Sequence, residues 1–332
     1  MHRAWVIHDY SGYQSLTLET FEDQEPGPGE IRLRVEAFAL NWGDMDLMCD
    51  RYSFSFREFP ARIGIEAAGI VDAIGPDVDG IALGERYCTL PYFYYDKGAS
   101  TESMLVDARY VTRAPDGLSA VEAASVWMQY MTAYYPIIEI SKGAPGKTFL
   151  VTAATGTAGT AALQIGRGCG ATMIATSRFA HNRAYLEEAG ADHVIIAGEG
   201  ELAAQLRELT GGRGIDAAFD PVGAGMIGQY APALARNARI YFYGTLDETM
   251  PTLPIVDMFQ ANAVFHPYSV FNYVQDETMC EKGKTFVYDA LACGSIAPRI
   301  DRTFAMEDYR NAWDYLKEPR RSHGKVMIET GL

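Results

Sequence analysis

The sequence predicts an α/β protein in which a β-rich domain is interrupted by a doubly wound domain with a parallel sheet. Up to about residue 125, short strand-like runs alternate with glycine- and proline-rich turns, which is typical of an irregular β-barrel. From about residue 147, strand-like and helix-like segments alternate, which implies right-handed crossovers between parallel strands. From about residue 295 the strand-rich texture returns. The length of 332 residues also favours two domains.

We therefore expect one domain from residues 1–125 and 295–332, and a second from residues 126–294. In the first domain the strand-like runs are 31–37, 67–74, 85–91 and, near the C-terminus, 325–329. In the second domain we expect strands at 148–153, 172–176, 193–196, 217–220 and 239–244, with helices at 158–168 and 182–189 among them.

The charge and the cysteines exclude several classes of protein. The formal net charge is −15, so the average field of the protein repels nucleic acids and anionic membranes. The N-terminus does not resemble a secretory signal, and no apolar stretch is long enough to span a bilayer, so we expect a cytoplasmic protein without a membrane partner. The five cysteines are scattered without a C-x-x-C pair, which argues against a disulfide framework or a zinc knuckle.

A glycine-rich loop follows the strand predicted at 148–153. The segment 154–159 reads A-T-G-T-A-G and precedes a predicted helix, which makes it a variant of the dinucleotide-binding fingerprint. Gly156 would let the backbone approach a pyrophosphate, and Gly159 would let the helix pack closely on the strand. The alternative is a purely structural tight turn. The predicted phosphate-binding residues are Thr155, Gly156, Thr157, Ala158 and Gly159.

The end of the next strand indicates which cofactor binds. Proteins that bind NAD usually carry an acidic residue about 20 residues past the loop, on the ribose 2′-hydroxyl. This chain has Ser177 and Arg178 there, with Arg183 five residues further on and no acid between the two arginines. A hydroxyl and guanidinium groups suit a 2′-phosphate, so the sequence favours NADPH. The alternative is that both arginines are ordinary surface charges.

Four motifs resemble the medium-chain dehydrogenase/reductase superfamily. They are G-I-E-A-A-G-I-V at 64–71, the loop 153–159, L-E-E-A-G-A-D-H-V-I at 186–195, and F-D-P-V-G at 219–223. They occur in the family's order along nearly the whole chain, and the zinc-free quinone oxidoreductase branch, which includes enoyl reductases, is the most similar. The resemblance implies a GroES-like catalytic domain, a Rossmann domain and a cleft between them.

The zinc ligands of that superfamily are missing. The family's zinc-dependent members have a Cys near position 41 and a His beside the motif Glu, whereas this chain has Asn41 and Ile65. The structural zinc of such enzymes needs four closely spaced cysteines, and the region after Gly84 holds only Cys88. We therefore expect no metal, and a structural role for Glu66.

The resemblance also implies further site residues. Asn41 would lie beside the nicotinamide, and Tyr52 could donate a hydrogen bond or relay a proton, although it could equally be a packing residue. Thr132 would hold the carboxamide, and the segment around Phe271 would border the nicotinamide. Lys325 either approaches cofactor phosphate or is a solvated lysine. The remaining predicted cofactor contacts, at strand ends, are Val222, Gly244 and Thr245.

Aromatic residues are unusually frequent in loop-like parts of the first domain. They could line a substrate pocket for a flat or apolar ligand, or form a satellite core or a subunit contact. Trp127 could also be a core residue of a helix. The predicted pocket residues are Trp42, Tyr92, Tyr94 and Trp127.

The leading hypothesis is a zinc-independent NADPH-dependent reductase of a small apolar carbonyl compound, either a quinone or an activated C=C bond in an enone or enoyl substrate. The alternatives are a zinc-free alcohol or carbonyl dehydrogenase, and a non-catalytic, crystallin-like NADPH-binding protein. The family habit of pairing Rossmann sheets edge to edge implies a homodimer. The run 263–265, followed by His266 and Pro267, could be that edge.

Overall fold

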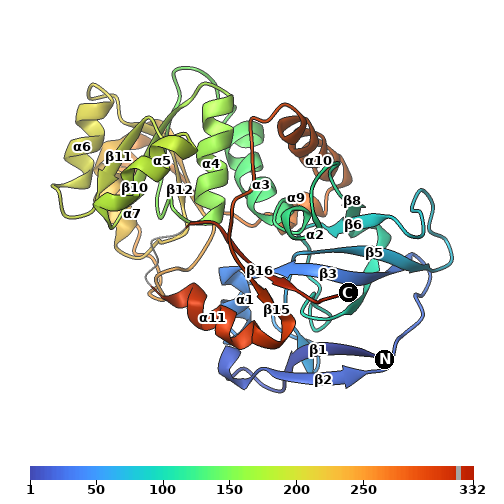
Figure 1. Cartoon of the computed structure of the whole chain (residues 1–332). Coiled ribbons are helices and arrows are strands. Elements are labelled where there is room, and N and C mark those ends of the chain that lie inside the picture. The colour runs from blue at the N-terminus through green and yellow to red at the C-terminus, as the bar shows by residue number, and fades with distance from the viewer. Residues whose placement is uncertain (319–322) are drawn as a thin grey trace. The chain divides into compact units, whose positions relative to one another are not determined.

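The computed structural model describes residues 1–318 and 323–332. The chain divides into two compact units: unit 1 comprises residues 1–128, 274–280 and 298–332, and unit 2 comprises residues 129–273 and 281–297. Unit 1 is built mainly from antiparallel strands, and unit 2 from a parallel sheet with helices (Figure 1). The predicted α/β fold class, with a β-rich part interrupted by a parallel-sheet part, is therefore confirmed.

Unit 1 contains two sheets. The smaller has the order β2-β1-β4, and the larger, seven-stranded sheet has the order β15-β16-β3-β5-β6-β8, with β7 also paired to β3. The strands are β1 (His2–Ile7), β2 (Thr17–Phe21), β3 (Glu30–Ala39), β4 (Ala61–Arg62), β5 (Ala67–Ile74), β6 (Arg86–Thr89), β7 (Ser103–Asp107), β8 (Val111–Arg113), β15 (Ile300–Ala305) and β16 (Lys325–Glu329). The helices of this unit include α1 (Trp42–Met48), α2 (Ala120–Ala123) and α11 (Tyr309–Lys317).

The second glycine of the motif at 64–71 is required by the close pairing of strands β3 and β5. Gly69 lies on β5, directly opposite Val35 of β3. A Cβ atom at Gly69 would lie only 2.2 Å from the carbonyl oxygen of Arg34, so no other residue fits unless the strands separate. This glycine therefore fixes β3 against β5, and Glu66 precedes β5 by one residue.

Unit 2 is a doubly wound fold. Its six parallel strands have the order β11-β10-β9-β12-β13-β14. The strands are β9 (Thr148–Val151), β10 (Thr172–Ser177), β11 (His193–Ile196), β12 (Ile215–Asp220), β13 (Leu234–Phe242) and β14 (Val264–Pro267). The helices along the chain are α3 (Trp127–Tyr134), α4 (Thr157–Gly168), α5 (Arg183–Ala189), α6 (Leu202–Leu209), α7 (Met226–Tyr230), α8 (Ile255–Ala261), α9 (Phe271–Val274) and α10 (Glu277–Ala292), where the ends of α3, α9 and α10 cross the unit boundaries.

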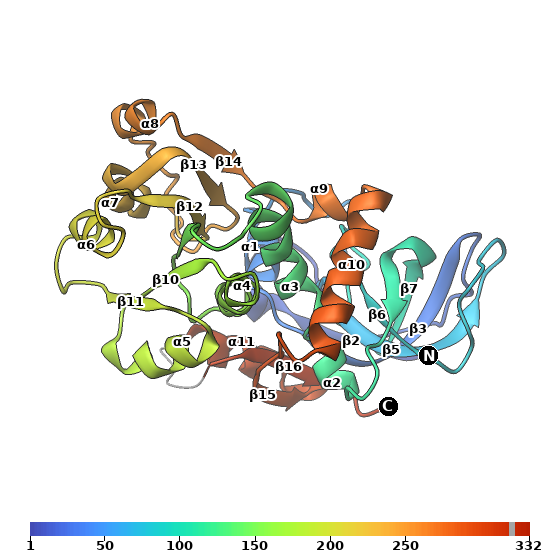
Figure 2. The same cartoon turned by 90° about the horizontal axis from the view of Figure 1, so that it is seen from above.

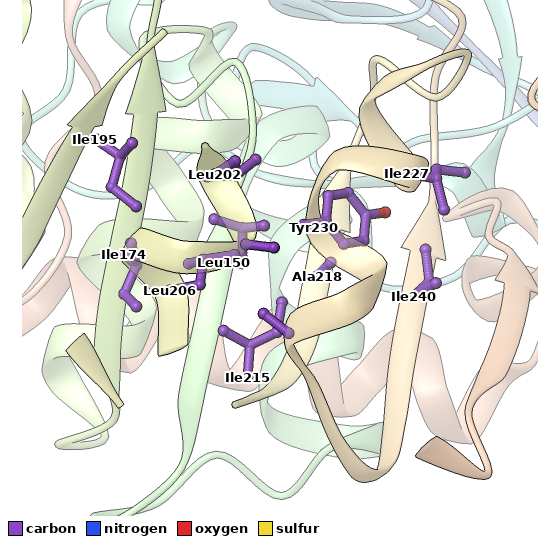
Figure 3. Packing of buried hydrophobic residues seen from close by; sticks show 12 residues of the cluster. Leu150, Ile174, Ile195, Leu202, Leu206, Ile215, Ala218, Ile227, Tyr230 and Ile240 are labelled. Carbon is purple, nitrogen blue, oxygen red and sulfur yellow. The ribbon is translucent and has the colours of Figure 1, made fainter. Parts of the chain in front are cut away.

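Both faces of the parallel sheet are buried. On one face, side chains of α6 and α7 such as Leu206 and Tyr230 pack against Leu150 and Ile174 of β9 and β10 (Figure 3). On the other face α4 lies so close to β10 that a Cβ atom at Gly166 would overlap Met173. Strands covered on both sides read as continuous apolar runs, which is why the sequence texture identified this sheet.

Strand β14 forms one edge of the parallel sheet, beside β13 (Figure 2). It contains Val264 and Phe265 and ends at Pro267, close to the run predicted as an edge. None of the helices in the described part of the chain combines the length and the apolar character that a membrane crossing requires.

Candidate active site

The phosphate loop is a tight turn between β9 and α4. The N–H of Gly156 donates to the carbonyl oxygen of Ala153 over 3.0 Å, and Ala153 adopts a left-handed φ of 46°. A Cβ atom at Gly159 would lie 2.8 Å from the Cα atom of Ala154, so this glycine is required for the helix to start against the loop. Gly156 is exposed at the N-terminus of the twelve-residue helix, where the first N–H groups and the helix dipole favour an anion.

The residues predicted to select the cofactor lie next to this loop. Ala154 donates to the carbonyl oxygen of Thr176 over 3.3 Å, which joins the loop to the end of β10. Ser177 is buried, and its hydroxyl contacts the Asn182 side chain at 2.9 Å, whereas Arg178 is exposed. Arg183 donates to the carbonyl oxygen of Val194 over 2.8 Å, so its guanidinium is already engaged. Arg178 is therefore the better placed of the two arginines for a 2′-phosphate.

Several predicted cofactor contacts share one edge of the sheet. The register pairs Val151 with Ala175 and Phe219, and Asp220 with Phe242. The carboxyl ends of the strands, followed by the phosphate loop, by Val222 and by Gly244 and Thr245, therefore lie at the same edge, where open α/β sheets bind ligands. Thr132 and Phe271 are buried in this unit. Because Phe271 is only 1% exposed, its side chain packs inside the unit, and any cofactor contact would have to come from the segment around it.

Asp220 organises this edge, although it was not among the predicted site residues. Its buried carboxylate accepts hydrogen bonds from the Thr152 hydroxyl at 2.5 Å, the Val222 N–H at 2.8 Å and the Tyr230 hydroxyl at 3.0 Å. Burial raises the pKa of this carboxyl group, and the hydrogen bonds oppose the rise. The carboxylate thus links the ends of β9 and β12 to α7. A lone acid at the end of a buried strand was the sequence signal for it.

Unit 1 brings the amide of the partly buried Asn41 together with the buried carboxylate of Glu66 and the buried ammonium of Lys325. The Nζ atom of Lys325 lies 2.6 Å from Oδ1 of Asn41 and 2.6 Å from Oε2 of Glu66. The other oxygen of Glu66 accepts from the N–H of Met128 over 3.0 Å. Lys325 is 1% exposed, so the interpretation as a solvated lysine is wrong. Because its ammonium contacts Asn41 and Glu66, we also drop its assignment to cofactor phosphate.

Helix α1 and the segment after it bring two further titratable groups, Asp44 and Tyr52, to this region. Asn41 precedes the helix, and its N–H donates to Oδ2 of buried Asp44 over 3.0 Å. Burial raises the pKa of Asp44 to about 7, and its Oδ1 atom has no hydrogen-bond partner in the described part of the chain. The Tyr52 ring lies against Gly43, where a Cβ atom would approach it to 2.9 Å. Burial, together with the charges of Asp44 and Asp46, raises the pKa of Tyr52 above its usual range.

Tyr52 begins a cluster of aromatic rings that differs from the predicted pocket. Phe54 lies 5.4 Å from Tyr52 and 4.6 Å from Phe93 between ring centroids, and Arg57 stacks on Tyr95 at 3.6 Å. Phe54, Phe93 and Tyr95 belong to the aromatic-rich loops that the sequence suggested as a pocket, although they were not among the four residues chosen for it. The structure brings segments 52–57 and 92–95 together, and whether they bind a substrate stays a prediction.

The predicted pocket residues have different environments. Trp127 is 0% exposed, and Tyr94 is buried with its hydroxyl donating to the carbonyl oxygen of Leu90 over 2.7 Å. Both are packing residues, so their assignment to a substrate pocket is wrong. Tyr92 is partly exposed and stacks on Tyr110 with 3.5 Å between centroids. Trp42, at 36% exposure, is the first residue of α1 and stays a predicted pocket residue.

The residues in unit 1 do not fit a zinc ion. The amide oxygen of Asn41 already accepts from the ammonium of Lys325, and Ile65 is a buried hydrocarbon. Across residues 1–318 and 323–332, no three His, Cys, Asp or Glu side chains are arranged to hold a metal. A positively charged side chain, and not a set of metal ligands, therefore meets the carboxylate of Glu66.

Comparisons with known proteins agree with the fold. Residues 27–116 match the family model of the alcohol dehydrogenase GroES-like domain, and residues 158–278 match that of the zinc-binding dehydrogenases. A 2-haloacrylate reductase from Burkholderia sp is 28% identical over 335 residues, which cover 99% of each chain. A mycocerosic acid synthase-like polyketide synthase of Mycobacterium tuberculosis is 33% identical over 209 residues, which are 63% of this chain and only 10% of that protein.

Solved structures align with nearly the whole chain. A mycobacterial quinone oxidoreductase is 25% identical, with a TM-score of 0.86 over 99% of this chain and 100% of that chain. A mycobacterial protein solved in complex with NADPH is also 25% identical, with a TM-score of 0.89 over 99% of this chain and 100% of that one.

Proposed function

Because the chain belongs to the medium-chain dehydrogenase/reductase superfamily, in its quinone oxidoreductase and enoyl reductase branch, we propose that it is a zinc-independent NADPH-dependent reductase of quinones or of activated C=C bonds. The observation that carries the proposal is the group of Asn41, Glu66 and Lys325 in unit 1. It replaces a metal centre with an amide that can polarise a carbonyl group by hydrogen bonding. The 2-haloacrylate reductase and the quinone oxidoreductase among the relatives support both substrate classes.

NADPH is the cofactor. The phosphate loop and α4 would hold its pyrophosphate, and Ser177 and Arg178 would hold its 2′-phosphate. When bound, the reduced nicotinamide supplies a hydride to an electron-poor carbon. The mycobacterial relative that was solved with NADPH supports this assignment.

The residues of unit 1 would polarise the substrate and supply a proton. Asn41 would donate a hydrogen bond to the carbonyl oxygen, which stabilises the negative charge that develops there. Tyr52 is protonated at neutral pH, as any tyrosine is, and burial raises its pKa further, so its hydroxyl can donate a hydrogen bond as well. The aromatic rings around Phe54 would contact a flat or apolar substrate.

The test is NADPH oxidation, followed by absorbance, with a quinone, an enone, 2-chloroacrylate and a simple aldehyde. We expect turnover with the quinone or with one of the two activated C=C compounds, before and after treatment with a zinc chelator. Turnover of the aldehyde alone would identify a carbonyl dehydrogenase instead, and NADPH binding without turnover of any compound would identify a non-catalytic binding protein. Loss of activity on chelation would disprove zinc independence.

Replacing Arg178 by glutamate should convert the 2′-phosphate site into a repulsive one. One charge-assisted hydrogen bond is worth roughly 1.5–3 kcal/mol, so we expect the Kd for NADPH to rise by about 10- to 100-fold, while the Kd for NADH does not rise. Fluorescence titration measures both constants. Arg236→Glu, an exposed arginine on β13, is the control of equal charge change and should leave both constants unaltered. Equal affinities of Arg178→Glu and wild type for NADPH would show that Arg178 is an ordinary surface charge.

A homodimer through the edge strand β14 is part of this proposal. Helix α8, which contacts the neighbouring strand β13, exposes Val256 by 67% and Phe259 by 80%, and Val264 on β14 is 44% exposed. Unpaired strand edges and exposed apolar patches favour association, and two copies of one edge are self-complementary. We expect Phe259→Asp to convert a dimer into a monomer in light scattering. Leu209→Asp on α6, also an exposed apolar position, should leave the dimer intact. A monomeric wild type would contradict this part of the proposal.

A further inference from the structure

The buried contact between Lys325 and Asn41 determines which end of the Asn41 amide faces outward. An ammonium group only donates hydrogen bonds, so the atom 2.6 Å from Nζ must be the amide oxygen. The amide nitrogen then lies on the other side, with one N–H directed toward Oε2 of Glu66 over a long 3.5 Å. That separation is at the limit of a hydrogen bond, so the NH2 group keeps donor capacity for another acceptor.

Lys325 is itself held firmly. Both Lys325 and Glu66 are 1% exposed, and Glu66 also accepts from the N–H of Met128. A buried ammonium cannot leave this carboxylate for water at low cost, and the fixed Glu66 in turn determines where Nζ lies. The orientation of the amide is therefore set by side chains of strand β16 and of the segment before β5, far from it in sequence.

We propose that Glu66 and Lys325 are positioning residues that hold Asn41 as a hydrogen-bond donor toward a carbonyl oxygen of the bound substrate or of the nicotinamide carboxamide. Both acceptors are carbonyl oxygens, and the kinetic and binding constants of the variants distinguish the substrate from the carboxamide. The inference rests on the proposed function for its kinetic readout, whereas the orientation of the amide can be read from stability alone.

The orientation is tested with Asn41→Asp and Asn41→Ala. Aspartate keeps an oxygen for Lys325 but places its second oxygen beside the carboxylate of Glu66, so its urea unfolding midpoint should fall below that of wild type and still lie above that of the alanine variant. In a Lys325→Met background the order of aspartate and alanine should reverse, because two carboxylates then share the site without a cation. If Asn41→Asp unfolds as early as Asn41→Ala in the wild-type background, the oxygen does not face Lys325 and the proposal fails, whether or not any substrate is turned over.

The donor role is tested by kinetics on the same variants. Aspartate at position 41 retains the contact with Lys325 but loses the NH2 group, so we expect kcat to fall by about 100-fold, as on removal of one oriented donor. An unchanged Kd for NADPH would assign the acceptor to the substrate, and a raised Kd would assign it to the carboxamide. Lys325→Arg should recover a large part of the activity that Lys325→Met loses. Wild-type kcat in a folded Asn41→Asp variant would overturn the donor role, whereas inactivity of the wild type on every compound would reject the proposed function instead.

Discussion

Replacement of Lys325 by methionine is expected to lower the free energy of unfolding by about 3–5 kcal/mol, because it leaves the carboxylate of Glu66 buried without a counter-ion. Asn41 loses the donor to its amide oxygen at the same time. Urea denaturation at neutral pH measures the change. The total free energy of unfolding of a domain is only about 5–15 kcal/mol, so this loss is a large part of it. It is the largest loss of stability that we expect from a single substitution of a buried residue.

Two control variants distinguish this mechanism from a general intolerance of the site. The double variant with Lys325→Met and Glu66→Gln removes the unpaired charge and should recover part of the lost stability. Lys142→Met removes an exposed lysine that lies 3.6 Å from Glu139, and it should change stability by less than about 1 kcal/mol. A loss below about 1 kcal/mol for Lys325→Met would mean that the buried contact is not maintained in solution.

Replacement of Gly159 by valine is expected to abolish tight NADPH binding. The new Cβ atom would lie 2.8 Å from the Cα atom and from the carbonyl oxygen of Ala154, so α4 must move away from the phosphate loop. Because the helix N-terminus and the loop bind the pyrophosphate together, we expect the Kd for NADPH to rise by at least about 100-fold, and overpacking to reduce stability by about 1–3 kcal/mol.

The matched control lies on the same helix. Gly168, at the C-terminal end of α4, has no atom within 4 Å of an added Cβ, so Gly168→Val should fold and bind NADPH like the wild type. Fluorescence titration of the two valine variants side by side gives the comparison. Equal Kd values would mean that the loop adapts to a side chain at position 159 and that the glycine spacing is not required for binding.

The sequence was most informative where the physical requirement is local. A buried parallel strand appears as an apolar run, and a helix that starts against a loop needs a glycine at the point of contact. The sequence therefore located Gly159 and the strand β9, which ends at Val151, two residues before the predicted end. Arg178 could be located directly after the neighbouring strand β10 in the same way, while its contact with a 2′-phosphate stays a prediction. These predictions needed no knowledge of distant contacts.

The missed and mistaken assignments all depend on contacts between distant segments. Lys325 and Asn41 are 284 residues apart, and nothing around Lys325 in the sequence distinguishes a buried ammonium from a solvated one. Trp127 and Tyr94 have both polar and apolar neighbours in the sequence, so their positions along the chain do not predict burial. Only the structure shows that their side chains pack inside unit 1. Asp220 is recognisable as an acid at a strand end, but its hydrogen-bonding partners Thr152 and Tyr230 come from other parts of the chain, the loop after β9 and helix α7.

The pairing of β16 with β3 has a consequence for the order in which the protein is made. Met327 lies opposite Ala39, and Lys325 is the partner of Glu66. During synthesis Glu66 and strand β3 emerge from the ribosome long before β16, which carries their partners Lys325 and Met327. Unit 2, whose residues lie between 129 and 297, is fully translated first. The sheet of unit 1 can therefore be completed only after β16 has emerged, and until then β3 lacks one of its paired strands, an open edge of the kind that favours association.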